Sequence, residues 1–93
     1  MYSRILYRMR NRIRNREYVV TAHARREMID DGYSVYDLER GVLTGEVVER
    51  QRDQMTGEWK YRIRGSTVSG SEIEVLTKLS PTNTLVFITV YEP

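Results

Sequence analysis

The chain has 93 residues, of which 40% are hydrophobic and 30% are charged, a composition typical of one folded domain over residues 1–93. It contains no cysteine, which excludes disulfides, zinc–thiolate sites and thiol catalysis, and we therefore expect a reducing, cytoplasmic environment. No apolar run approaches the roughly 20 residues of a membrane-spanning helix, so we expect no membrane association.

Charge is distributed unevenly along the chain. Residues 1–16 carry six arginines and no acid, whereas the remainder has nine basic and 13 acidic residues. Arginine outnumbers lysine 13 to 2, and a guanidinium makes forked contacts with phosphate or carboxylate groups. We therefore expect RNA or an acidic protein as a partner. The alternative is a solvated helix face whose arginines pair with acids elsewhere in the chain.

Residues 1–16 predict a basic amphipathic helix that ends near Asn15. Its apolar residues recur at intervals of three and four, and three of its arginines lie one turn apart on another face. These candidate RNA contacts are Arg4, Arg8 and Arg12. A homodimer built through the apolar stripe of this helix is a structural alternative.

Two further helices are expected after a short strand. The β-branched run over residues 18–21 predicts the strand, and Thr21 then supplies a cap for a helix over 22–31. Ser34, followed by an acid three residues later, resembles a capping box and predicts the start of a helix over 35–43.

From residue 46 the apolar pattern changes to period two, and turn residues divide it into four segments. We predict strands over residues 46–52, 58–64, 72–79 and 85–91. The last strand is apolar at nearly every position, which predicts a central strand covered on both faces. The expected fold is α+β: an antiparallel sheet of four strands, or five with residues 18–21, with two or three helices packed on one face.

The second of these strands alternates between apolar and basic side chains. Its apolar residues are expected to face the helices and its basic residues the open face, where they suit a phosphate backbone. The basic candidates are Lys60, Arg62 and Arg64, joined by Arg50 and Arg52 of the preceding strand if the register allows it. In the alternative, Glu72 and Glu74 of the following strand neutralise this ladder through cross-strand pairs.

His23 is the only histidine. An unperturbed histidine has a pKa near neutrality, so this side chain is the one best suited to act as a general acid or base at neutral pH. A histidine at the start of a helix also serves in packing alone, so both roles stay open. No metal-ligand spacing, glycine-rich phosphate loop or serine nucleophile pattern is visible, and we expect neither a metal nor a cofactor.

Residues 21–50, TAHARREMIDDGYSVYDLERGVLTGEVVER, resemble a small prokaryotic family of domains of unknown function. Its members read roughly H-A, E-M two residues later, D-G-I-S, D-V or D-L, and then G-E-[IV]-[IV]-E. They tend to close on I-T-V-Y, as residues 88–91 do here, and the similarity spans residues 17–93. This chain departs from the family in lacking a cysteine-containing strand and a second catalytic histidine, and the basic helix lies outside the matched region.

Members of that family are similar to toxins of the RelE, BrnT and motility-quorum-sensing-regulator kind, commonly encoded beside a zinc-finger antitoxin of the YgiT type. The resemblance therefore implies a RelE-like fold over residues 17–93 and neutralisation by a cognate antitoxin. It implies the toxin of a type II toxin–antitoxin system, acting as a metal-independent mRNA endoribonuclease.

Metal-free RNA cleavage requires a base for the 2′-hydroxyl proton, an acid for the leaving oxygen and cations around the phosphate. The catalytic candidates are His23 and Tyr91 for proton transfer, with Arg26, Lys60 and Arg62 holding charge. The RNA-binding candidates are Arg4, Arg8, Arg12, Arg50, Arg52 and Arg64. The alternative function is a non-enzymatic binding module that docks a protein partner or nucleic acid through its basic face.

Overall fold

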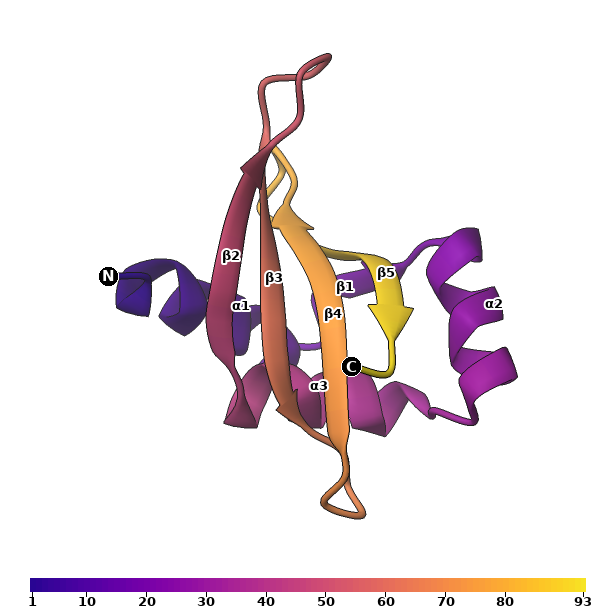
Figure 1. Cartoon of the computed structure of the whole chain (residues 1–93). Helices are drawn as coiled ribbons and strands as arrows, with labels where there is room; N and C mark the ends of the chain where they lie inside the picture. The colour runs from indigo at the N-terminus through magenta and orange to yellow at the C-terminus, as the bar shows by residue number, and fades with distance from the viewer.

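A computed structural model describes all 93 residues, which form three helices and a five-stranded sheet (Figure 1). In chain order the elements are α1 (Ser3–Arg14), β1 (Tyr18–Val20), α2 (Ala22–Asp31), α3 (Val35–Thr44), β2 (Glu46–Arg52), β3 (Trp59–Ser66), β4 (Glu72–Leu79) and β5 (Leu85–Tyr91). The α+β class is confirmed, and each predicted helix and strand is present with ends shifted by at most two residues.

The strands lie in the order β1-β5-β4-β3-β2. Strands β2 to β5 form the expected antiparallel meander, but β1 pairs parallel with β5, so the sheet is mixed rather than fully antiparallel. The expected central position of β5 is wrong, because β4 is the middle strand and β5 is second from the edge. Leu85, Phe87 and Val90 of β5 are buried, but its other residues are only half-buried, so the expected cover on both faces is wrong as well.

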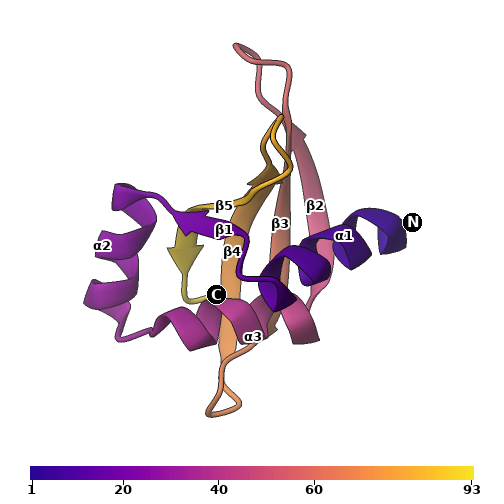
Figure 2. The ribbon, with the colours of Figure 1, turned by 180° about the vertical axis from the view of Figure 1, so that it is seen from behind.

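The helices do not all lie on one face. Helices α1 and α3 cover one face of the sheet and leave the other open, as seen from behind in Figure 2. Helix α2 instead stands at the edge of the sheet beside β5 (Figure 1). There Thr21 donates its backbone N–H to the Phe87 carbonyl (3.1 Å). Glu27 Oε1 accepts from the Val90 N–H (3.0 Å). These bonds satisfy backbone groups of β5 beyond the end of β1, which is why α2 lies at the edge.

The expected N-terminal caps of the second and third helices are both present. The Thr21 hydroxyl accepts from the Ala24 N–H (3.1 Å), and Gly32 ends α2 in the left-handed region with φ 75°. Ser34 and Asp37 form a complete capping box at the start of α3. These local signals fix where each helix starts and ends, independently of the sheet.

Helix α3 packs on β3 with their backbones in direct contact. A Cβ atom built on Gly65 of β3 would lie 2.1 Å from the carbonyl oxygen of Gly41. One built on Gly45 would lie 2.4 Å from the same oxygen. Real Cβ contacts are never this short, so these positions require glycine, and their absence of side chains lets the helix approach the sheet closely.

Arg10 of α1 holds the C-terminal end of α3. Its Nε donates to the Val42 carbonyl (3.1 Å) and its Nη2 to the Gly45 carbonyl (2.7 Å). The last carbonyls of a helix lack partners within the helix, and a cation is favourable there because of the helix dipole. Arg10 therefore has a structural role that neither interpretation of the N-terminal arginines predicted, since its partners are backbone carbonyls and not phosphates or carboxylates.

We expect Gly65→Ala to lower the free energy of unfolding by about 1–3 kcal/mol or more, because the new methyl group meets a backbone carbonyl that has no room to move. Urea denaturation followed by tryptophan fluorescence measures this. Ser66→Ala is the control, since the Ser66 hydroxyl makes no hydrogen bond, and it should change stability by less than about 0.5 kcal/mol. Equal stability of the Gly65→Ala variant and the natural chain would contradict the close contact of α3 and β3.

Candidate nucleic-acid interface

The register of β2 against β3 decides on which face the basic residues of β2 lie. Pairing shifts by one residue within residues 47–49, so that Arg50 lies opposite Tyr61 and Arg52 opposite Trp59. Such a β-bulge reverses the inward–outward alternation for every residue after it. The two arginines therefore lie on the helix-covered side of the sheet and do not join the basic residues of β3.

The basic residues of β3 do lie on the open face, but a carboxylate pairs with each of them. The nitrogen–oxygen distances are 3.7 Å for Lys60–Asp53, 3.8 Å for Arg62–Glu49, 3.9 Å for Arg62–Glu74 and 2.6 Å for Arg64–Glu74. The alternative in which an acid of β4 neutralises the ladder is thus confirmed for Glu74. Glu72, the other expected partner, makes no ion pair. The open face carries mixed charge rather than a free cationic ladder.

Glu74 is a buried carboxylate with only 2% of its surface exposed. It lies at the centre of a group on the open face, here called the open-face cluster, whose other members are Arg62, Arg64 and Tyr91. Arg64 donates to one of its oxygens from both Nε (2.9 Å) and Nη2 (2.6 Å). Burial alone would raise the pKa of Glu74, but hydrogen bonding with Tyr91 and Arg64 and the charges of Arg62 and Arg64 outweigh it and lower that pKa. Glu74 is therefore an anion across the neutral range.

Tyr91 completes the open-face cluster from β5, in register opposite Glu74. Burial and the neighbouring Glu74 carboxylate raise the pKa of Tyr91, and the adjacent Arg62 only partly offsets this. The phenol is therefore protonated at neutral pH, which fits a proton donor and not a base. The structure brings together two of the predicted catalytic residues, Arg62 and Tyr91.

The other predicted catalytic residues stand apart from this pair. His23 lies at the start of α2 with 59% of its side chain exposed, and its Nε2 is 3.3 Å from Glu27 Oε1. Since the same carboxylate oxygen accepts from the backbone of β5, Glu27 ties α2 to the sheet and His23 is an outer member of that contact. Arg26 is exposed on α2 without an ion pair, and Lys60 is held by Asp53.

Both arginines of β2 lie beside the Trp59 ring on the helix-covered side of the sheet. The Cζ atom of Arg50 lies 3.9 Å from the centroid of the indole ring, and that of Arg52 lies 4.9 Å from it. Arg50 Cζ is also 5.9 Å from the centre of the Tyr2 ring. These distances are within the range of cation–π attraction, and neither arginine has a carboxylate within ion-pair distance. Trp59 itself is 37% exposed.

Helix α1 extends this arrangement with arginines of its own. Its N-terminal half runs past β2 and projects beyond the edge of the sheet (Figure 1). Arg8 donates to Asn83 Oδ1 (3.0 Å) and has no carboxylate partner, Arg4 is exposed one turn earlier, and Arg12 pairs with Glu17 at 3.1 Å. We define the basic aromatic surface as Tyr2, Arg4, Arg8, Arg50, Arg52 and Trp59.

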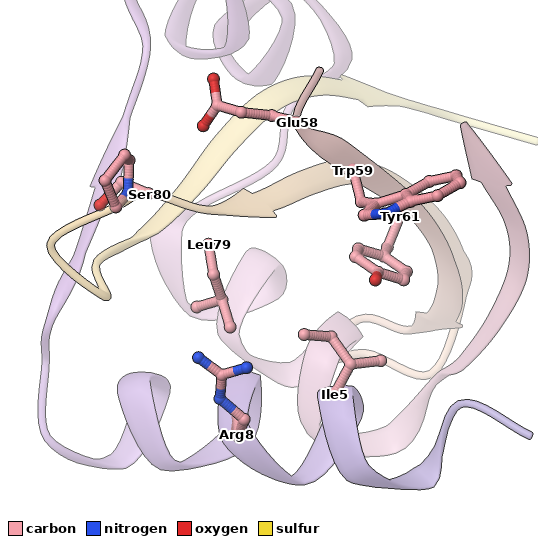
Figure 3. A pocket seen from close by; sticks show the side chains of 8 residues that line it. Ile5, Arg8, Glu58, Trp59, Tyr61, Leu79 and Ser80 are labelled. Atoms are coloured by element: carbon pink, nitrogen blue, oxygen red, sulfur yellow. The ribbon is translucent and has the colours of Figure 1, made fainter. Parts of the chain in front are cut away.

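A groove of about 330 Å³ opens beside Trp59. It lies between α1, the start of β3 and the turn that joins β4 to β5, with Ile5 and Arg8 on the helix side (Figure 3). Tyr61 and Leu79 point into it from the sheet. Sequence reasoning missed this groove, because three segments far apart in the chain form it and none carries a local signal of its own.

No three imidazole, carboxylate or thiol groups are arranged so that they could hold a metal ion.

None of the three helices combines the length and the apolar character needed to cross a bilayer.

The chain belongs to the family described as a domain of unknown function, DUF4258, whose model matches residues 20–92. The match includes α2, α3 and all of the antiparallel meander, and it leaves α1 outside. No curated protein and no solved structure matches the chain. Because the family has no assigned function, the function has to be argued from the geometry of the two charged surfaces.

We expect Glu74→Gln to lower the free energy of unfolding at pH 7 by about 2–3 kcal/mol. This is less than the roughly 3–5 kcal/mol of a fully buried pair, because Arg64 remains half exposed. Since folding lowers the pKa of Glu74, its stabilising contribution is present above the ordinary carboxyl pKa of about 4.3 and is lost as the pH falls through the lowered value.

Urea denaturation between pH 7 and pH 3 should therefore show the gap between the natural chain and this variant narrowing towards acid. Glu72→Gln, on the same strand but exposed and unpaired, is the matched control. A gap that stays constant with pH would contradict the lowered pKa of Glu74.

Proposed function

We propose that this chain binds single-stranded RNA through the basic aromatic surface. One observation carries the proposal: the four arginines of this surface have no carboxylate partner, whereas each basic residue of β3 on the open face has one. Phosphates bind most favourably where cations are not already neutralised, since each such contact releases counterions from the nucleic acid.

The aromatic residues favour a single strand over a duplex. Exposed Trp59 and half-buried Tyr2 lie beside guanidinium groups, and the bases of an unpaired strand stack on aromatic rings and guanidinium planes. In double-stranded RNA the faces of the bases are covered by the neighbouring base pairs and cannot stack on protein side chains. An acidic protein segment matches the charge of the arginines but gives the rings no planar partner, so RNA accounts for more of this surface.

We expect the double variant Arg50→Gln/Arg52→Gln to weaken binding of a fluorescently labelled ten-nucleotide RNA about tenfold or more in 100 mM salt. The slope of log affinity against log salt should become shallower by about 1.4, which is about 0.7 for each lost phosphate contact. Fluorescence anisotropy across a salt series measures both quantities.

The matched control is Arg25→Gln/Arg26→Gln, which removes the same charge from exposed positions of α2 at the other end of the molecule (Figure 1). It also tests Arg26, a predicted catalytic residue. If both double variants lose affinity equally, binding follows net charge and the basic aromatic surface is not the site.

A second candidate function is the expected one, a RelE-like toxin of a type II system that cleaves mRNA without a metal. The open-face cluster favours it. Arg62 lies beside Tyr91 on the open face, and 34% of its side chain is exposed, so part of its guanidinium can reach a phosphate. The protonated phenol of Tyr91 beside it suits an acid for the leaving oxygen. The cluster lacks an evident base, which ranks this function second. Its cognate antitoxin, of the zinc-finger kind that the resemblance suggests, would cover the open face.

Induction in cells followed by sequencing of transcripts with new 5′-hydroxyl ends tests the second function. If the cluster is catalytic, Arg62→Ala and Tyr91→Phe should each reduce cleavage on the order of 10²–10³-fold. Neither change touches the basic aromatic surface, so RNA binding should persist in both. Undiminished cleavage by the two variants would remove these residues from any active site.

A further inference from the structure

The helix-covered side also holds the groove beside Trp59. Contacts between arginines and phosphates do not account for this groove. From its lining we infer that it is a binding pocket for one unstacked nucleobase of the bound strand. This inference rests on the proposed function and specifies which part of the RNA the groove takes.

Four of the eight residues that line the groove are apolar or aromatic, and the others are Arg8, Glu58, Ser80 and Pro81. Ile5 from α1 and Tyr61 and Leu79 from the sheet point towards its centre, while the Arg8 guanidinium lies at the side of Leu79 (Figure 3). Its volume of about 330 Å³ is at the lower end of the roughly 300–1,000 Å³ range of ligand pockets. A single planar ring system fits a space of this size, whereas a dinucleotide cofactor does not.

The charged residues around the groove indicate which kind of molecule it can bind. Arg8 lies on one side, and Arg50 and Arg52 stack on Trp59 at the other. The one acid of the lining, Glu58, turns its carboxylate away from the groove, where Lys78 donates to it at 3.1 Å (Figure 3). The groove is therefore apolar within and cationic on its flanks.

A base within an RNA strand matches this distribution. It is flat, with faces that stack on apolar and aromatic side chains and a polar edge that can stay towards the open side of the groove. It carries a phosphate on each side, which guanidinium groups on opposite flanks of the groove can receive. An apolar side chain of a protein fills the groove but brings no flanking anions. Because a base must leave its stack to enter, the pocket should favour single strands over duplexes.

Trp59 is the only tryptophan of the chain and lines the groove, so its fluorescence reports directly on occupancy. The intact protein is titrated with an eight-nucleotide RNA, the same strand with abasic riboses, the corresponding duplex, and inorganic polyphosphate of similar charge. We expect the single strand to change Trp59 fluorescence and to bind about tenfold more tightly than the other three probes.

One groove-filling variant and one pair of charge variants sharpen the test. Ile5→Phe fills the groove and should weaken binding of the intact strand about tenfold while leaving polyphosphate unaffected, with circular dichroism verifying the fold. Arg8→Gln should weaken binding more than Arg14→Gln. Both lose one charge from α1, but Arg14 lies about 120° around the helix from Arg8 and about 180° from Ile5.

Equal affinity for the intact and abasic strands, with no change in Trp59 fluorescence, would overturn the base pocket and leave RNA binding by the arginines standing. Failure of every probe to bind would instead overturn the proposed function itself. The abasic and polyphosphate comparisons show on the unaltered chain whether the bases contribute to binding, and Arg8→Gln against Arg14→Gln tests whether they do so at the groove even if Ile5→Phe fails to fold.

Discussion

One bulged residue in β2 controls how charge is divided between the two sides of this protein. The pairing shift falls at Val48, between Val47 and Glu49. In an uninterrupted ladder, Arg50 would lie opposite Lys60 on the open face and Glu49 would point towards the helices. With the bulge, Arg50 points towards Trp59 and Glu49 reaches Arg62. The single inserted residue thereby places Arg50 and Arg52 on the helix-covered side, where they have no carboxylate partner. It also places Glu49 on the open face, within ion-pair distance of Arg62.

The two sides that result have different physical character. On the open face, the cations surround buried Glu74, and removing them from that carboxylate would leave it unpaired at a high cost. Their first role is therefore to stabilise the sheet. On the helix-covered side, Arg50 and Arg52 lie over aromatic rings and have no carboxylate partner, so they can turn towards a phosphate without leaving a buried charge behind. This difference is why RNA binding is assigned to the side that the helices share.

Much of the fold was predictable from local patterns, whereas the site was not. The helix caps at Thr21 and Ser34 and the period-two segments after residue 46 mark the elements because their signals are contained in short stretches. The alternation of β3 likewise separates apolar from basic residues correctly. The bulge has no such local signature, since a valine at position 48 fits a regular strand equally well. The site of the arginines therefore depended on a register that only the three-dimensional structure provides.

Long-range pairing limited the prediction of the other site residues in the same way. That Arg10 bonds carbonyls of α3 and Arg8 bonds Asn83 cannot be read from a helical pattern of arginines. The structure places Tyr91 beside Arg62 because β3 and β5 both flank β4, with Glu74 between them. His23, the residue that the sequence made most prominent, contacts only Glu27 among the charged groups and joins neither surface.

The most direct measurement is nuclear magnetic resonance mapping of a short single-stranded RNA on the isotopically labelled chain. If the helix-covered side is the nucleic-acid interface, the indole N–H of Trp59 and the amides of α1 and β2 will shift and broaden together. The amides around Glu74 and Tyr91 will stay in place. Shifts confined to the open face, with the Trp59 signal unmoved, would contradict the account.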